Sequence, residues 1–209
     1  MTLRRVSSGA RNYREALCVG GIFAEHRVPH IVGVSMQLDL ARAIYERSHL
    51  VGDFLLRSGQ RSTVYFDKYR FECEPMLLRQ IAEQLALLVP PKTDVIAGLE
   101  LGGIPLVTAV GLVTGMPMAF VRKKAKEYGT CQLAEGTPVA GRQVVVIEDV
   151  ITSGGQVAES IRALRERGAL IDCALCVIDR EQGGRELLGS LGVELRALFT
   201  LQQLEQAVL

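Results

Sequence analysis

The sequence gathers two acids, two hydroxyl residues and two glycines in one short run, residues 144–156. Its first four residues are apolar and predict a central strand, and Glu148 and Asp149 follow where we expect that strand to leave the sheet. A Thr-Ser-Gly-Gly turn comes next and leads into a predicted helix. Backbone amides in such a turn, with a helix N-terminus behind them, can bind a phosphate monoester, which glycine allows to approach closely. The pattern therefore indicates a phosphate site beside two carboxylates.

The two carboxylates need a ligand of a different kind. Because they repel phosphate, Glu148 and Asp149 should face hydroxyl groups or a metal-bridged group. A ribose 5-phosphate satisfies both demands. The structural alternative is that the acids are solvated residues at a strand end and that the glycines form a tight turn. Two other phosphate motifs are absent: GxGxxG does not occur, and residues 98–103 have the spacing of GxxxxGK[ST] but are followed by Ile104 in place of the lysine.

Three further segments carry glycines or charges beside predicted strands. Residues 98–105 form a glycine-rich turn between a strand and a helix, which is a second backbone anion site. Residues 121–129 have four cations against one acid, a pattern that by itself is typical of a solvated surface. Arg180 follows another strand, and its guanidinium can form a two-pronged contact with a planar carboxylate or imide. The alternative for Arg180 is a salt bridge to Asp179 or Glu181.

The elements that must position these groups alternate between strands and helices. An amphipathic helix is predicted over 37–49, a hairpin from strands 54–57 and 63–66, and a helix from Pro75 that ends before Pro90. Later strands are predicted over 94–97, 118–121, 144–147, 174–178 and 194–199. Later helices are predicted over 104–114, 156–167 and 185–191, and after a capping box of Thr200 and Gln203. Apolar strands that alternate with helices predict an α/β fold with a mostly parallel sheet covered on both faces, where ligands bind beyond the carboxyl ends of the strands.

Composition supports one compact soluble domain and excludes several functional classes. The chain has 209 residues, of which 48% are hydrophobic, and a formal net charge of +1. So many apolar residues argue against disorder, and near-neutral charge provides no global attraction for nucleic acid or an anionic membrane. No apolar run approaches the ~20 residues of a membrane helix. We therefore expect no nucleic-acid partner and no membrane partner.

The five cysteines show no secretory pattern, which favours a reducing compartment and a cytoplasmic location. Cys173 and Cys176 form a CxxC, but they lie three apart on a predicted strand and should point to opposite faces. We therefore interpret them as buried strand cysteines rather than as a metal or redox site.

Residues 1–35 carry five arginines against two glutamates without a clear amphipathic period, and we assign them no fold. Three interpretations of this segment are a signal peptide, a transit peptide and a start codon assigned too early. The last is favoured, with Met36 as the true start. Residues 36–209 are expected to form a single domain, with a small hood over 36–70 and a core over 71–209.

Residues 144–156 resemble the motif that binds phosphoribosyl pyrophosphate (PRPP) in type I phosphoribosyltransferases. The resemblance extends over most of the chain from about residue 37, and its details are similar to the orotate phosphoribosyltransferases. It implies a type I phosphoribosyltransferase-like α/β fold with an N-terminal hood. It also implies transfer of ribose 5-phosphate from PRPP to orotate in pyrimidine (UMP) biosynthesis, which yields orotidine 5′-monophosphate (OMP) and pyrophosphate. The implied cofactor is Mg²⁺ bound through PRPP without direct protein ligands, and the implied assembly is a homodimer.

The resemblance also assigns roles to individual residues. The PRPP-binding residues would be Gly102, Gly103, Arg122, Lys123, Lys126, Glu148, Asp149, Val150, Ile151, Thr152, Ser153, Gly154, Gly155 and Gln156. The catalytic residues among them would be Lys123, Lys126, Glu148 and Asp149, with Lys123 donated across the dimer interface. The orotate-binding residues would be Arg57, Tyr65, Phe66, Thr152 and Arg180. Some members of the family have lysine in place of Gly102 or Arg57, and histidine in place of Tyr128.

Two alternatives stay open. The first is a phosphoribosyltransferase for another base, such as a purine, against which Arg180 and the aromatic pair Tyr65 and Phe66 argue. The second is a non-catalytic regulator that senses PRPP with the same fold. The cations of residues 121–129 and the lack of a clear helix-turn-helix argue against this second alternative.

Overall fold

The computed structural model describes residues 30–55, 59, 61–124 and 133–209. Six strands form the central sheet in the order β5-β4-β3-β6-β7-β8. They are β3 (Val95–Leu99), β4 (Met118–Val121), β5 (Ala134–Gly136), β6 (Gln143–Ile151), β7 (Leu170–Asp179) and β8 (Glu194–Thr200). Every neighbouring pair is parallel except β4 and β5, which are antiparallel. The five predicted core strands are confirmed, while β5 was missed because three residues are too few to show a period.

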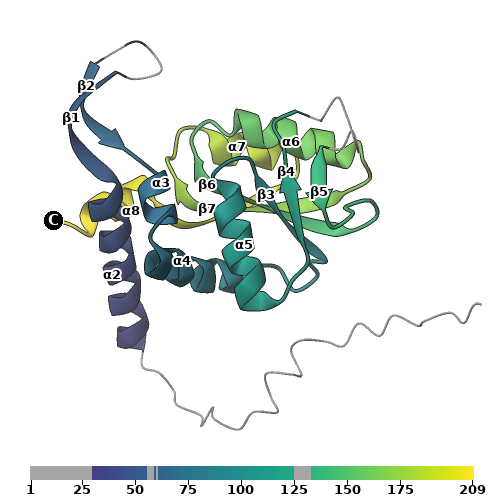
Figure 1. Ribbon diagram of the computed structural model, residues 1–209, viewed down its shortest axis with the longest axis horizontal. Helices are drawn as coiled ribbons and strands as arrows, with labels where there is room; N and C mark the ends of the chain where they lie inside the picture. The colour runs from purple at the N-terminus through teal and green to yellow at the C-terminus, as the bar shows by residue number, and fades with distance from the viewer. Residues whose placement is uncertain (1–29, 56–58, 60, 125–132) are drawn as a thin grey trace, which may run out of the picture.

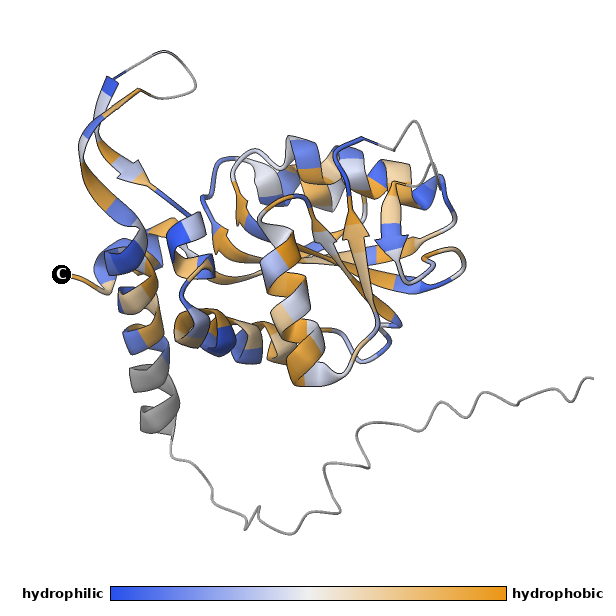
Figure 2. Ribbon diagram, in the orientation of Figure 1, coloured by the Kyte–Doolittle hydropathy of each residue, from blue (hydrophilic) through white to orange (hydrophobic). Residues whose placement is uncertain are grey.

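Helices cover both faces of this sheet (Figure 1). The helices α4 (Pro75–Leu88) and α5 (Gly103–Thr114) pack with α8 (Leu201–Gln206) in one apolar cluster, while α6 (Gly155–Arg165) and α7 (Gly184–Ser190) pack in a second cluster on the other face. Figure 2 shows the hydrophobic residues concentrated along the central strands. The prediction of a mostly parallel sheet between two helical layers is therefore confirmed.

A helix and a hairpin precede the sheet. Helix α2 (His30–Ser48) leads directly into β1 (His49–Leu55), which pairs with β2 (Arg61–Phe66) in antiparallel fashion. Figure 1 shows this hairpin extending away from the body of the molecule, and the short α3 (Tyr69–Glu72) links it back to α4. The predicted hairpin is confirmed, but its first strand begins at His49, five residues before the predicted start at Phe54. The predicted start of the helix at residue 37 is wrong, because α2 begins seven residues earlier, within the segment to which the sequence assigned no fold.

The sheet opens between its two middle strands. Strand β6 pairs with β3 only as far as Ile147, opposite Gly98, but pairs with β7 as far as Ile151, opposite Asp179. The prediction that β6 ends before its acidic pair is therefore wrong, because pairing with β7 carries the strand four residues further. Strands are added in one direction after β3 and in the other after β6, so this opening is the topological switch point where α/β proteins bind ligands.

Two smaller predictions are also confirmed. Cys173 packs in the cluster of α4 and Cys176 in the cluster of α6, and both are buried free thiols on opposite faces of β7. Burial raises the pKa of Cys173 to about 11 and the pKa of Cys176 well above its usual value, as expected for unreactive core cysteines. Thr200 and Gln203 form the reciprocal hydrogen bonds of a capping box at the start of α8.

Within the described residues, no helix has both the length and the apolar character needed to cross a membrane.

Candidate active site

Three acids and one lysine meet where the sheet opens. Glu148 and Asp149 of β6 are 8% and 0% exposed, and Glu72 of α3 is 5% exposed. Lys68, which directly precedes α3, places its ammonium nitrogen Nζ 2.6 Å from Asp149 Oδ2 and 2.9 Å from Oδ1. The backbone amide of Val150 donates to Asp149 Oδ1 at 2.5 Å. Asp149 is therefore held from two directions, although its carboxylate is fully enclosed.

Two of the three acids have a raised pKa. Burial, followed by the nearby charge of Asp149, raises the pKa of Glu148 and of Glu72 to about 9 each. Burial alone would lower the pKa of Lys68, but the hydrogen bond and charge of Asp149 outweigh it and raise that pKa. The ion pair of Asp149 and Lys68 therefore lies beside two glutamic acids whose raised pKa favours the protonated form at neutral pH.

The glycine turn after β6 lines a cavity of about 330 Å³. Its lining residues include Lys68 and Glu148 and continue without interruption from Val150 to Val157. Gly154 has a φ of +74°, and a Cβ atom there would lie 3.1 Å from the backbone of Gly184, so both conformation and space favour glycine. The cavity thus combines the amide-rich start of α6 with a buried carboxyl group, the two features from which the sequence predicted a phosphorylated sugar.

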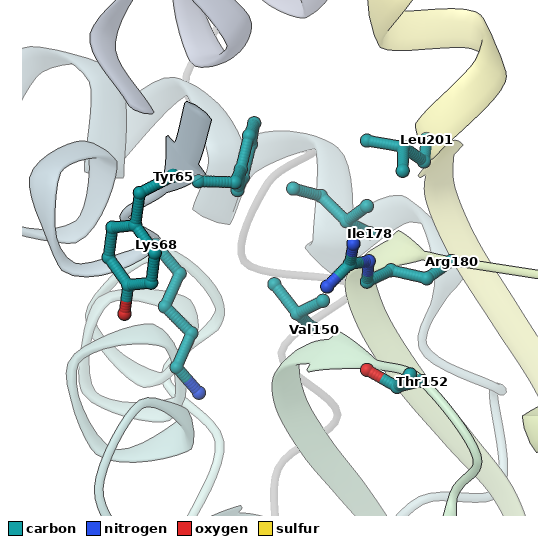
Figure 3. Close-up of a pocket in the computed structure, with 8 residues that line it drawn as sticks. Tyr65, Lys68, Val150, Thr152, Ile178, Arg180 and Leu201 are labelled. Carbon is teal, nitrogen blue, oxygen red and sulfur yellow. The ribbon is translucent and has the colours of Figure 1, made fainter. Parts of the chain in front are cut away.

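A second cavity of about 240 Å³ adjoins this turn (Figure 3). It is lined by Tyr65, Phe66, Lys68, Val150, Thr152, Ile178, Arg180 and Leu201. The hairpin residues Tyr65 and Phe66 thereby line one cavity with Thr152 and Arg180. The resemblance assigned all four to orotate binding, and that assignment stays a prediction. Figure 3 shows Lys68 and Arg180 entering this pocket from opposite sides.

Arg180 does not form the salt bridge that was its structural alternative. Asp179 pairs instead with Arg185 at 3.0 Å and also accepts a hydrogen bond from the backbone amide of Glu181. Within the described residues, Arg180 has no ion-pair partner, and its guanidinium lines the second cavity. This cation is consequently available to a ligand.

The turn between β3 and α5 packs tightly against the acids. A Cβ atom on Gly102 would lie 1.6 Å from Asp149 Oδ2 and 3.0 Å from Glu72 Oε1. A Cβ atom on Gly103 would lie 2.4 Å from the carbonyl oxygen of Ile147. Gly102 therefore lies beside Asp149 and Gly103 beside Ile147, the residue before the acidic pair, and a side chain on Gly102 would require Asp149 to move.

The basic segment after β4 begins next to this turn. The backbone amide of Lys123 donates to Glu100 Oε2 at 3.2 Å, and Arg122 lies 3.5 Å from Glu135. The side chain of Lys123 is exposed. Three residues singled out in the sequence, Arg57, Lys126 and Tyr128, lie outside the described residues.

Sequence reasoning missed Lys68 and Glu72. Both lie in or next to a single-turn helix whose charges are typical of a solvated surface, and Lys68 is 81 positions away from its partner Asp149. The only available signal was their position directly after the aromatic pair Tyr65 and Phe66, close to a predicted ligand pocket.

The fold and the site define the chain as a type I phosphoribosyltransferase. The family described as "Phosphoribosyl transferase domain" matches residues 74–189. The chain resembles the crystal structure of an orotate phosphoribosyltransferase from Aeropyrum pernix with a TM-score of 0.69 and 35% identity, over 81% of this chain and 97% of that one. It resembles the PRPP complex of the orotate phosphoribosyltransferase from Mycobacterium tuberculosis with a TM-score of 0.70 and 26% identity, over 81% of this chain and 99% of that one.

Sequence similarity identifies the family within the type I phosphoribosyltransferases. An orotate phosphoribosyltransferase from a Nocardioides species is 50% identical over 174 residues, which cover 83% of this chain and 97% of that protein. The chain belongs to the orotate phosphoribosyltransferase family.

Proposed function

We propose that the protein transfers ribose 5-phosphate from PRPP to orotate, which yields OMP and pyrophosphate in pyrimidine nucleotide biosynthesis. The observation that carries this proposal is the junction of the two cavities, which share Lys68, Val150 and Thr152. One cavity offers aromatic and cationic groups to a flat anionic base. The other offers backbone amides and the carboxyl group of Glu148 to a phosphorylated sugar, so a bond between base and sugar would form where the cavities meet.

The proposed mechanism needs no protein nucleophile. Departure of pyrophosphate leaves an oxocarbenium-like ribose, and the protein holds base, sugar and leaving group in line. Glu148 and Asp149 accept hydrogen bonds from, or donate them to, the ribose hydroxyls. The charge of Asp149 lies near the developing positive charge and stabilises it. The amides of residues 152–156 hold the 5′-phosphate.

A separate set of residues is proposed to bind the leaving group, pyrophosphate. Arg122, Lys123 and Lys126 neutralise pyrophosphate, and the turn at Gly102 and Gly103 presents backbone amides to it. Lys123 is proposed to come from the partner subunit of a homodimer. Tyr65, Phe66, Thr152, Arg180 and Arg57 are proposed to contact orotate.

Mg²⁺ fits this site as an ion carried by PRPP. Glu148 Oε2 is buried without a hydrogen-bond partner among the described residues, and it lies in the cavity proposed for the sugar. Glu148 and Asp149 would hold the sugar hydroxyls that accompany the ion. When bound, Mg²⁺ would neutralise negative charge on the pyrophosphate oxygens.

The cytoplasmic location and the division into hood and core stay predictions.

The test is consumption of a base in the presence of PRPP and Mg²⁺. Orotate, uracil, adenine and hypoxanthine are incubated separately with the enzyme, and loss of the base is followed by absorbance and chromatography. We expect orotate alone to be consumed, with OMP and pyrophosphate formed in equal amounts. Consumption of a purine would identify the enzyme as specific for another base, and PRPP binding without turnover of any base would identify a regulator.

A further inference from the structure

Lys68 stands at the junction of the two cavities and is assigned no role in the reaction proposed above. Its Nζ contacts both oxygens of Asp149, yet 34% of its side chain remains exposed and it lines both cavities. An ammonium group has three N–H donors. One of them is donated to Asp149 Oδ1, and Nζ lies 2.6 Å from Oδ2 in the same ion pair. Within the described part of the chain, the ammonium group has no acceptor other than Asp149.

The backbone around Lys68 is fixed, so the location of this cation is part of the fold. The amide of Asp67 donates to the carbonyl oxygen of Ser48 at 2.8 Å, and the amide of Tyr69 donates to Asp67 Oδ1 at 3.2 Å. Lys68 Nζ also lies 5.4 Å from the centroid of the Tyr69 ring. These contacts hold the residue between the hairpin and α3, with its ammonium group against the buried face of β6.

The chemistry of orotate places a negative charge at this same junction. Its carboxylate is on C6, the carbon next to the nitrogen N1 that bonds to the ribose. A base that attacks the sugar must therefore carry its carboxylate where the base pocket meets the sugar pocket. Asp149 is ion-paired with Lys68 next to that junction and would repel the carboxylate unless a cation stands beside both.

We propose that Lys68 is a specificity-determining residue that binds the C6 carboxylate of the base while it remains paired with Asp149. This inference rests on the proposed function and deepens it. Arg180 enters from the opposite side of the pocket and is left to recognise the remaining edge of the ring. The enzyme thereby distinguishes orotate from uracil, which has only a hydrogen atom at C6.

The test compares OMP with uridine 5′-monophosphate (UMP), which differ only in that carboxylate. Their dissociation constants are measured by titration calorimetry with the parent enzyme, Lys68→Gln, Lys68→Arg and Lys68→Met. Glutamine can still donate a hydrogen bond to Asp149 but carries no charge, whereas arginine keeps the charge. Arg70→Met, which removes an exposed cation one residue into α3, is the matched control.

We expect the parent to bind OMP more tightly than UMP. The affinity ratio should fall about tenfold to a hundredfold in Lys68→Gln, the loss typical of one charged hydrogen bond, and should stay near the parent value in Lys68→Arg and Arg70→Met. Because both ligands titrate the same sample, incomplete folding changes the active fraction and leaves the ratio unaffected. Lys68→Met should show the same fall.

Equal weakening of OMP and UMP in Lys68→Gln and Lys68→Met would overturn the inference, since Lys68 would then serve only to support Asp149. That result leaves the proposed function intact if the parent consumes orotate. A parent that consumes no orotate refutes the proposed function, and the inference falls with it.

Discussion

The α-carbon of Gly102 directly faces the carboxylate of Asp149, so closely that a methyl group on Gly102 would lie 1.6 Å from Oδ2. Asp149 cannot turn away without leaving Lys68, because its carboxylate is fully enclosed. The turn after β3 and the acid of β6 are therefore fitted to each other. Any side chain at this position would have to displace the carboxylate of Asp149.

Gly102→Ala should therefore impair PRPP binding by displacing Asp149 from the ribose site. We expect the KM for PRPP to rise about tenfold or more, consistent with the loss of a hydrogen bond to a charged group. Steady-state kinetics with PRPP as the varied substrate measures the effect. Gly189→Ala in α7, where a Cβ atom meets nothing within 4 Å, is the control. An unchanged KM in Gly102→Ala would show that Asp149 does not touch the sugar.

Lys123→Ala should lower kcat far more than it weakens PRPP binding. The side chain is exposed and acts, in our proposal, on charge that develops only as pyrophosphate leaves. Removing one such contact typically lowers kcat by ~10² to 10³. Single-turnover rates and PRPP affinity are compared with those of Lys124→Ala, which removes the neighbouring exposed cation. Equal rates in Lys123→Ala and the parent would exclude the catalytic role.

Mixed dimers test whether Lys123 acts in the partner's site. Lys123→Ala and Asp149→Asn are each expected to be nearly inactive. After subunit exchange at equal concentrations, random pairing should restore about a quarter of the parent activity, because one site in each mixed dimer has both intact residues. If Lys123 serves its own subunit instead, both sites of the mixed dimer contain one defect and no activity returns.

Stability should fall as the pH rises, and Glu72 should cause part of the fall. Burial and the charge of Asp149 raise the pKa of Glu72 to about 9 in the folded chain, against a usual value of 4.5. From about pH 5 to about pH 9 the folded state keeps a proton that the unfolded state has lost, so the free energy of unfolding decreases over that range. Lys68, Asp149 and Asp67 are the charged groups around this carboxyl.

Glu72→Gln should make that decrease shallower, because its amide does not titrate. Glu148 keeps its own raised pKa and with it the remaining slope. Urea denaturation at several pH values gives the measurement, with the exposed Glu159→Gln as control. Parallel curves for Glu72→Gln and the parent would mean that Glu72 is ionised in the folded protein.

Arg180→Lys should raise the KM for orotate and leave the KM for PRPP nearly unchanged. Lysine keeps the charge but loses the planar two-pronged contact, a loss that we expect to cost about tenfold or more. The two KM values from one set of kinetic data check the prediction, and PRPP is the internal control. A parallel rise in both values would indicate that Arg180 supports the pocket rather than contacting the base.

The sequence was sufficient for the sheet, its helices and the phosphate turn, because their signals are local. Residues 144–147 are all apolar, which predicts a buried strand. The glycines of the next turn predict that a phosphate approaches the backbone closely. The extent of β6 was not predictable in the same way. Glu148 and Asp149 look like the end of a strand, and only pairing with β7 shows that they continue it.

Lys68 and Glu72 were not predictable for a different reason. Each belongs to the site through contacts with Asp149, which is far away in the sequence, and each lies in or beside a helix of one turn. A charged residue in such a segment is usually solvated. Their place in the site follows from side-chain contact with Asp149 of β6, which is a tertiary relationship without a local sequence pattern.

The one-sided pairing of β6 beyond Ile147 has a consequence for affinity. On the side of β7 the backbone that carries the two acids is already ordered by its ladder, while on the side of β3 the ladder ends at Ile147. Binding there would require little further loss of conformational entropy from the protein. The backbone that carries the two acids would therefore be preorganised for the sugar when the chain has folded.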